Sequence, residues 1–99
     1  MINHFRDQWL KDFFLYVKSS NVIPSSLESA LARKLDMINA ATSHRELRSP
    51  PGNMYESLNP PLAGYSAIRV NRQYRLVFMW SEGKADDLYL SPHKYTPYK

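Results

Sequence analysis

The chain has 99 residues, of which 43% are hydrophobic, and it contains no cysteine. This length and composition predict one small domain over residues 1–99 without disulfides, and a reducing, cytoplasmic location is the simplest interpretation. The formal net charge of +4 at pH 7 favours polyanionic partners such as nucleic acid or an acidic protein. The opening residues alternate charged and apolar side chains, and no stretch approaches the roughly 18 apolar residues that span a bilayer. Secretion and membrane insertion are therefore disfavoured.

The basic residues are spread evenly between the two halves of the chain. Residues 1–49 hold seven basic and five acidic side chains, and residues 50–99 hold six and four, so there is no basic tail. The local exception is the window 66–80, which contains Arg69, Arg72 and Arg75 and no acidic residue. This window is the first candidate for contact with an anion.

Two amphipathic helices are predicted in the first half, after residues 1–5, which could form a short strand. Apolar residues recur at helical spacing over residues 6–18. Ser25 and Glu28 have the spacing of a capping box, and apolar residues then recur every three or four positions up to Ala41. Because a short link joins the two helices, we expect them to lie antiparallel in one layer. Ser43 and Glu46 repeat the capping spacing and predict one or two further turns.

Short runs rich in aromatic and β-branched residues indicate strands in the second half. They cover residues 54–58, 65–70, 74–80 and 88–90, and Gly83 supplies a tight turn before the last run. Residues 76–80 are all apolar, as in a central strand covered on both faces. The predicted fold class is α+β, with two N-terminal helices packed on a small, mainly antiparallel sheet. The other face of the sheet is then either solvated or a binding surface.

The hairpin in this sheet carries the most informative charges. A three-residue loop at residues 71–73 would place Arg69 directly opposite Arg75 on the face away from the helices. Like charges in this position destabilise a sheet unless an anion, such as a phosphate, lies between them. The alternatives are that both side chains reach into water or pair with Asp86 or Asp87 on the next strand.

Histidines and other reactive groups give one further candidate site. His4 and His44 are interpreted as surface or capping residues. His93, Lys94 and Tyr95 bring an imidazole, an ammonium and a phenol together, which suits acid-base chemistry near neutral pH, or they form an exposed basic tail. Without cysteine or a His-x-x-x-His pair a metal site is disfavoured. There is also no glycine-rich phosphate loop and no Gly-x-Ser-x-Gly elbow.

Four stretches of the sequence together resemble one known family across nearly the whole chain. They are MINHF, ARKLDMINAAT, LRSPPGNMYESL and GYSAIRVNRQYRLVFMW. In the last of them an arginine follows an aromatic residue after the turn, here Tyr74 and Arg75. The chain resembles HigB-like toxins of the RelE superfamily, the ribosome-dependent messenger-RNA endonucleases of bacterial toxin-antitoxin pairs. The resemblance implies two N-terminal helices against an antiparallel sheet.

The chain departs from the family pattern in two places. Many relatives carry a basic Gly-Lys or Asp-Arg loop before the hairpin, whereas residues 58–64 contain no cation. Relatives also commonly end in Asp-Tyr-His, where this chain has Ser-Pro-His-Lys-Tyr at residues 91–95. Either His93 or Tyr95 takes the place of the family's terminal histidine.

The resemblance implies RNA cleavage without metal or cofactor, by attack of a ribose 2′-hydroxyl on the adjacent phosphate. Arg75 would stabilise the phosphorane, assisted by Arg69, while His93 and Tyr95 would share the acid and base roles. The residues expected to bind RNA are Arg48, Arg69, Arg72 and Lys94.

The implied partners are the ribosome with its mRNA and a small HigA-like helix-turn-helix antitoxin covering the basic face. An operator DNA would be contacted only indirectly, through the antitoxin, and no membrane is involved. Two other functions fit the sequence. The chain could be a non-catalytic basic module that blocks the ribosome by occupancy, or an inactive relative that represses transcription together with its antitoxin.

Overall fold

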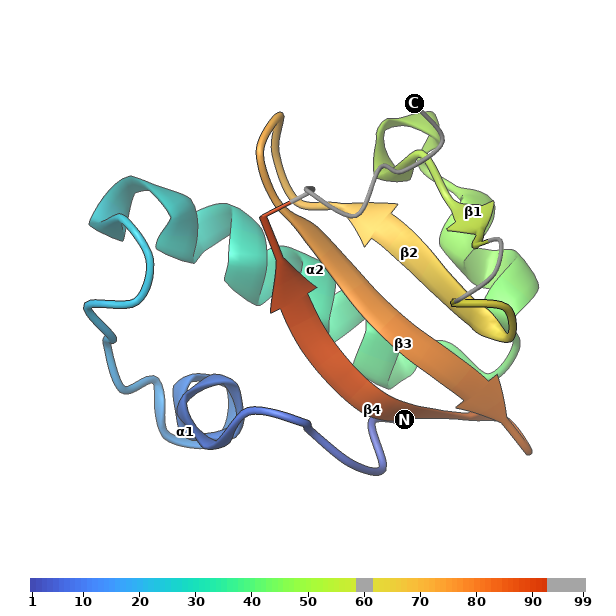
Figure 1. Cartoon of the computed structure of the whole chain (residues 1–99), viewed down its shortest axis with the longest axis horizontal. Coiled ribbons are helices and arrows are strands. Elements are labelled where there is room, and N and C mark those ends of the chain that lie inside the picture. The colour runs from blue at the N-terminus through green and yellow to red at the C-terminus, as the bar shows by residue number, and fades with distance from the viewer. Residues whose placement is uncertain (59–61, 93–99) are drawn as a thin grey trace.

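The computed structural model describes residues 1–58 and 62–92. The elements are α1 (Gln8–Tyr16), the 3-10 turn η1 (Ser25–Leu27), α2 (Glu28–Ala40), the 3-10 turns η2 (His44–Arg48) and η3 (Pro51–Asn53), and the strands β1 (Glu56–Ser57), β2 (Tyr65–Arg69), β3 (Arg75–Ser81) and β4 (Lys84–Ser91) (Figure 1). Two helices and an antiparallel sheet confirm the predicted α+β class.

The two helices form where the apolar spacing predicted them, but they are not an antiparallel pair. In Figure 1 α2 runs across the sheet, whereas α1 is seen nearly end-on beside β4. The link between them does not fold back as a tight helical hairpin. Val17 leaves α1 with a left-handed backbone (φ 53°), and the chain then runs through residues 18–24 before η1 begins. This longer path allows α1 to turn away from the direction of α2.

One of the two predicted helix caps forms. α2 has no side-chain cap, and it is entered through the turn η1 instead of a capping box at Ser25. Glu28 instead accepts a hydrogen bond from the Ser19 hydroxyl at 3.5 Å. Ser43 caps η2, because its hydroxyl accepts a hydrogen bond from the backbone N–H of Arg45 at 3.2 Å.

The four strands lie in the order β1-β2-β3-β4, and every neighbouring pair is antiparallel. The predicted turn before β4 forms with positive φ at both Glu82 (51°) and Gly83 (78°), the combination that a type I′ hairpin turn requires. β1 has two residues instead of the five predicted, and β4 begins at Lys84 instead of residue 88.

The additional length of β4 is paired with the beginning of the chain. Ile2 and Ala85, and Phe5 and Leu88, form isolated parallel bridges along the outer side of β4. Residues 1–5 therefore add backbone hydrogen bonds to an edge that would otherwise be open. They do not form a regular strand.

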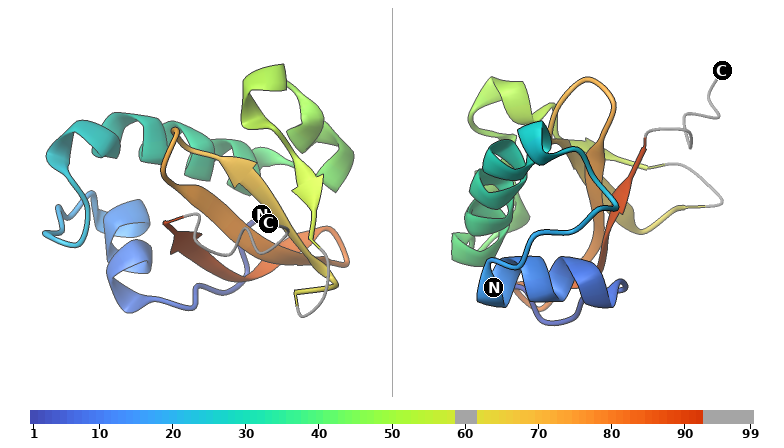
Figure 2. Two further views of the ribbon diagram at one scale, coloured as in Figure 1. Left: turned by 45° about the horizontal axis from the view of Figure 1, so that its top comes forward. Right: turned by 90° about the vertical axis from the view of Figure 1, so that its left-hand side faces the viewer.

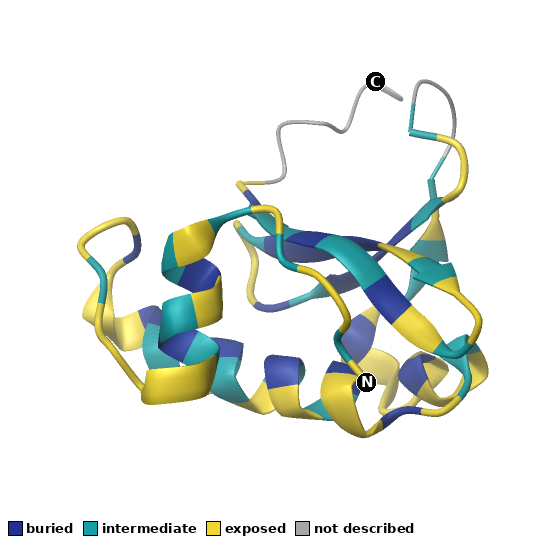
Figure 3. Cartoon of the chain, turned by 90° about the horizontal axis from the view of Figure 1, so that it is seen from below, coloured by how far each residue is buried: buried dark blue, intermediate teal, exposed yellow. Residues whose placement is uncertain are grey.

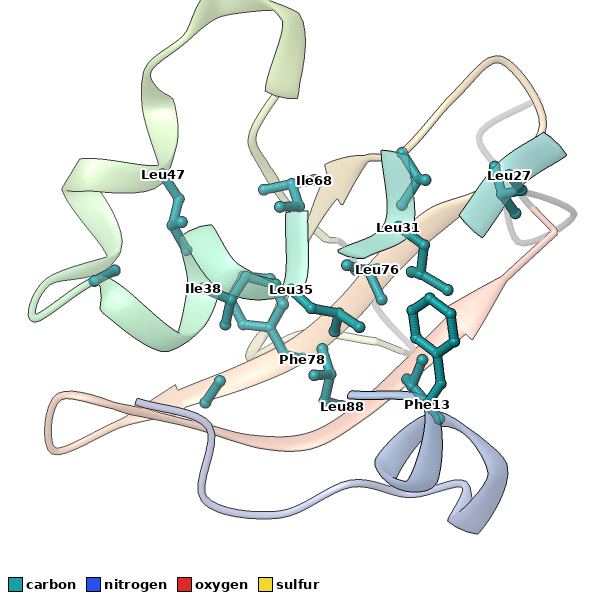
Figure 4. Packing of buried hydrophobic residues seen from close by; sticks show 14 of the residues in the cluster. Phe13, Leu27, Leu31, Leu35, Ile38, Leu47, Ile68, Leu76, Phe78 and Leu88 are labelled. Atoms are coloured by element: carbon teal, nitrogen blue, oxygen red, sulfur yellow. The ribbon is translucent and has the colours of Figure 1, made fainter. Parts of the chain in front are cut away.

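The core lies between α2, α1 and one face of the sheet (Figure 4). Leu31 and Leu35 of α2 are fully buried, as are Leu76 and Phe78 of β3, and Phe13 reaches this cluster from α1. Burying a side chain of this size stabilises a fold by about 1.5–3 kcal/mol. Buried and exposed residues alternate along both helices (Figure 3), as amphipathic spacing predicts. No helix among the described residues covers the other face of the sheet, which we call the open face (Figure 2).

Candidate functional site

The β2–β3 hairpin places two arginines side by side on the open face. Arg69 is paired directly with Arg75, as predicted from the three-residue loop. The loop itself is fixed by Asn71, whose Oδ1 accepts hydrogen bonds from the backbone N–H groups of Gln73 and Tyr74, both at 2.8 Å. This is the local turn chemistry that favours asparagine, and it fixes the register of the two cations.

Arg75 is buried and Arg69 is half-buried, and three of their nitrogens have no acceptor among the described residues. Only 6% of Arg75 is exposed. Its Nε and Nη1, and Nε of Arg69, are buried and form no hydrogen bond within the part of the chain that the structure describes. The predicted alternative of an ion pair with the next strand is not what forms, because Asp87 binds Arg6 and Asp86 binds Asn3. Buried donors beside a second cation have the hydrogen-bonding capacity and the charge that suit an anion.

The open face continues from this pair along the strands. Ala67 and Val77 are both fully buried although they point away from the helical layer, so neighbouring side chains form the accessible surface here. Tyr89 is paired with Val77, and Ser91 with Arg75, so one phenol lies one row along the strand from the cations. The arginine pair therefore has an aromatic side chain beside it on the open face.

A second polar cluster lies at the far end of this face and is organised by Asp87. Asp87 sits at a β-bulge opposite β3 and has a positive φ of 53°. Its carboxylate accepts two hydrogen bonds from Arg6, from Nε at 3.0 Å and from Nη2 at 2.6 Å, and a third from the Tyr65 hydroxyl. The Arg6 guanidinium also lies over the Tyr89 ring, 3.8 Å from its centroid.

These contacts change the acidity of all three groups. Hydrogen bonds from Arg6 and then Tyr65 lower the pKa of Asp87 from 3.8 to about 2. The hydrogen bond to Asp87 raises the pKa of Tyr65, and the hydrogen bond to the same carboxylate raises the pKa of Arg6. At neutral pH the cluster therefore holds a carboxylate, a guanidinium and a neutral phenol.

The other predicted site residues are distributed differently. Arg72 is exposed in the loop at the tip of the hairpin, next to the arginine pair. Arg48 lies on η2, with its guanidinium 4.9 Å from the centroid of the Tyr55 ring, just before β1. His93, Lys94 and Tyr95 fall outside the described residues.

Sequence reasoning missed the cluster around Asp87. Its members are Arg6, Tyr65, Asp87 and Tyr89. The one available signal was an acidic pair followed by Leu-Tyr-Leu, which is unusual inside a strand and typical of a bulge or an edge. The partner Arg6 comes from the opposite end of the chain, so no local pattern points to it.

Other features of the described residues do not form a second reactive centre. No three side chains among them are placed to hold a metal ion. A hollow of about 310 Å³ lies beside the end of α1, with both polar and apolar walls lined by residues such as Trp9, Asp12 and Lys18. None of the described helices is long and apolar enough to cross a bilayer.

Known proteins are similar to this chain in fold and in sequence. A chain of the YoeB-YefM complex from Staphylococcus aureus matches 89% of this chain and 94% of its own length, with a TM-score of 0.54 and 18% identity, so the fold is shared. Toxin HigB-1 of Vibrio cholerae is 50% identical over 95 residues, covering 96% of this chain and all of the relative. An uncharacterized protein of Haemophilus influenzae is 47% identical over 92 residues, covering 93% and 91% of the two chains.

These matches define a RelE-like toxin of a type II toxin-antitoxin system. The family model described as the RelE-like toxin of the type II toxin-antitoxin system HigB matches residues 3–93, and the chain belongs to this HigB-like toxin family.

Proposed function

We propose that this toxin is a ribosome-dependent endoribonuclease that cleaves mRNA and so stops translation. The observation that carries the proposal is the pairing of half-buried Arg69 with buried Arg75 on the open face, with three nitrogens that have no acceptor among the described residues. A phosphate placed between the two side chains supplies acceptors and neutralises their repulsion. Because the chain belongs to the HigB-like toxin family, we take this phosphate to be part of an RNA.

The chemistry is transfer of a phosphoryl group within the RNA. The 2′-oxygen forms a bond to phosphorus, the bond from phosphorus to the 5′-oxygen breaks, and the products are a cyclic phosphate and a 5′-hydroxyl. One proton leaves the 2′-hydroxyl and one is delivered to the departing oxygen. We assign these proton transfers to His93 and Tyr95, which lie beyond β4 in the sequence.

Arg75 stabilises the negative charge that accumulates on the phosphorane, and Arg69 assists. Two guanidinium groups held in place before the reaction avoid the cost of reorganising solvent around the developing charge. No metal is required for this stabilisation. Arg48, Arg72 and Lys94 are assigned to the RNA backbone, where charge and reach matter more than fixed geometry.

The proposed partners follow from the family and from the charge. The net charge of +4 and the open basic face suit an antitoxin that supplies acidic and apolar side chains. We propose a small helix-turn-helix antitoxin, which would also carry any contact with operator DNA. The site of action is the cytoplasm, on the ribosome with its mRNA.

Primer extension on ribosome-bound mRNA tests the activity. Wild-type protein is expected to create new 5′ ends, and a variant with both Arg75→Ala and His93→Ala is expected to lose at least about 100-fold in cleavage rate. Arg33→Ala is a matched control, because Arg33 is exposed on α2 on the other side of the sheet. Equal cleavage by the double variant contradicts the site. Inhibition of translation without new 5′ ends indicates block by occupancy instead.

A further inference from the structure

The Arg6 side chain is held rigidly, yet it remains open to solvent. Its guanidinium makes two hydrogen bonds to Asp87 and lies on the face of the Tyr89 ring. The Arg6 side chain is nevertheless 44% exposed. A planar cation that is fixed on one face and exposed elsewhere is a surface on which a second planar group can stack.

The anchoring of residues 1–6 does not depend on this side chain. Backbone hydrogen bonds already join this segment to β4, from Asn3 to Ala85 at 2.8 Å and between Arg6 and Leu88 at 2.8 Å. The side-chain contacts instead fix the plane of the guanidinium. Asp87, which adopts the positive φ at the bulge, is aimed at Arg6 and is held there by the Tyr65 hydroxyl.

The location of this surface relates it to the arginine pair. Tyr89 and Ser91 point to the same side of β4, and Ser91 is paired with Arg75. Two residues along a strand span about 7 Å, so the stack lies roughly one nucleotide away from the anion site. Val77 pairs directly with Tyr89 in the row next to Arg75, so no further row of side chains lies between the stack and the arginine pair.

We infer that the stack of Arg6 on Tyr89 binds the nucleobase next to the phosphate held by Arg69 and Arg75. The inference rests on the proposed function, because it takes single-stranded RNA as the ligand. Bases stack on arginine planes as well as on aromatic rings, and such stacking tolerates every base. Asp87 and Tyr65 act as positioning residues, since they orient Arg6 and do not touch the RNA.

A binding assay separates base stacking from phosphate contact. The probes are a short RNA oligonucleotide with 2′-O-methyl riboses, which cannot be cleaved, and its counterpart lacking one base. Stacking is worth about 1–3 kcal/mol per base, so wild-type protein is expected to prefer the complete oligonucleotide by about 10-fold. Arg6→Lys keeps the charge but not the plane, and it is expected to lose this preference while its affinity for the abasic probe stays the same.

Two further variants complete the test. Asp87→Asn weakens the bidentate contact that orients Arg6. Its preference for the complete oligonucleotide is expected to lie between that of Arg6→Lys and that of the wild type. Arg33→Lys on α2 makes the same chemical change on the other side of the sheet and is expected to keep the full preference.

The result that overturns the inference is a base preference that survives Arg6→Lys, or a wild type with no preference. Either result stands whatever the ribosome assay shows. Conversely, a base preference without cleavage on ribosomes contradicts the proposed catalysis and leaves the base site in place.

Discussion

Arg69 and Arg75 face each other across β2 and β3 in direct register, and Arg75 is almost completely buried. Such an arrangement costs stability, because buried donors without acceptors lose their hydration without compensation. Proteins retain destabilising arrangements of this kind at functional sites. A ligand that supplies acceptors to the two arginines is therefore expected to stabilise the hairpin.

Replacement of Arg75 by methionine should separate stability from activity. Arg75→Met keeps much of the apolar stem and removes the buried cation, so the free energy of unfolding is expected to rise by about 1 kcal/mol. Cleavage of ribosome-bound mRNA is expected to fall at least about 100-fold. Urea unfolding and primer extension measure the two effects. The control is Arg72→Met, in the exposed loop, which should change the free energy of unfolding by less than about 0.5 kcal/mol. If Arg75→Met is instead less stable than the wild type, the Arg75 guanidinium makes stabilising interactions in the fold.

The ion pair of Asp87 and Arg6 should make stability depend on pH in the acid range. The pKa of Asp87 is lowered from 3.8 to about 2 in the fold. Its contribution is therefore complete above the unfolded value and is lost as the pH falls through about 2. The two side chains are 44% and 30% exposed, so screening limits the contribution to about 1 kcal/mol.

Urea unfolding at about pH 5 and about pH 2 measures this contribution. Wild-type protein is expected to lose about 1 kcal/mol more than Asp87→Asn between the two conditions. Salt at about 1 M should shrink the difference, because it screens an exposed pair. The same loss in both proteins would show that Asp87 carries no stabilising charge.

Asn53 should be essential to the connection between α2 and the sheet. Its side chain is fully buried, donates to the carbonyl oxygens of Leu47 and Ser49, and accepts a hydrogen bond from Nζ of Lys34 at 2.5 Å. Burial lowers the pKa of Lys34, and the proximity of Arg33 contributes to the same effect.

Asn53→Ala removes all of these partners at once and is expected to cost about 2–3 kcal/mol in the free energy of unfolding. Asn71→Ala makes the same substitution at an exposed turn and should cost about 1 kcal/mol or less. Thermal or urea unfolding distinguishes the two positions. Equal losses would mean that burial adds nothing to the cost at Asn53.

Val17 should be a site where stability can be gained. It is a β-branched residue with a left-handed backbone (φ 53°) and 82% of it is exposed, so it strains the backbone and packs little. Asparagine tolerates this conformation, and Val17→Asn is expected to raise the free energy of unfolding by about 0.5–1 kcal/mol. Val22→Asn replaces another exposed valine without positive φ and should change it by less than about 0.5 kcal/mol. A loss at Val17 in urea unfolding would mean that the valine makes stabilising contacts.

Local chemistry explains which parts of the fold were predictable. The hairpin with Arg69 opposite Arg75 followed from apolar alternation and a loop that begins with asparagine, and both signals lie within a dozen residues. The direction of α1 did not follow, because it depends on the path of residues 17–24 and on where Phe13 enters the core. The start of β4 was missed because Asp86 and Asp87 disfavour a strand and are accommodated only by a bulge and by residues 2–5 along its edge.

The candidate site divides in the same way. The arginine pair comes from neighbouring strands joined by a short loop, so the sequence alone could bring it together. The contact of Arg6 with Asp87 joins residues 81 positions apart, and no periodicity carries that information. The contact of Arg6 with Asp87 is determined by tertiary packing alone.

The separation between Arg6 and Asp87 also sets the order in which this protein is assembled during its own synthesis. Arg6 leaves the ribosome early, but its partner belongs to the last strand, so the stack on Tyr89 is absent until β4 has left the exit tunnel. The hairpin that carries Arg69 and Arg75 also needs β4 before its central strand has neighbours on both sides. Neither the paired arginines in a complete sheet nor the stack of Arg6 on Tyr89 can therefore form in a nascent chain before β4 is free to fold.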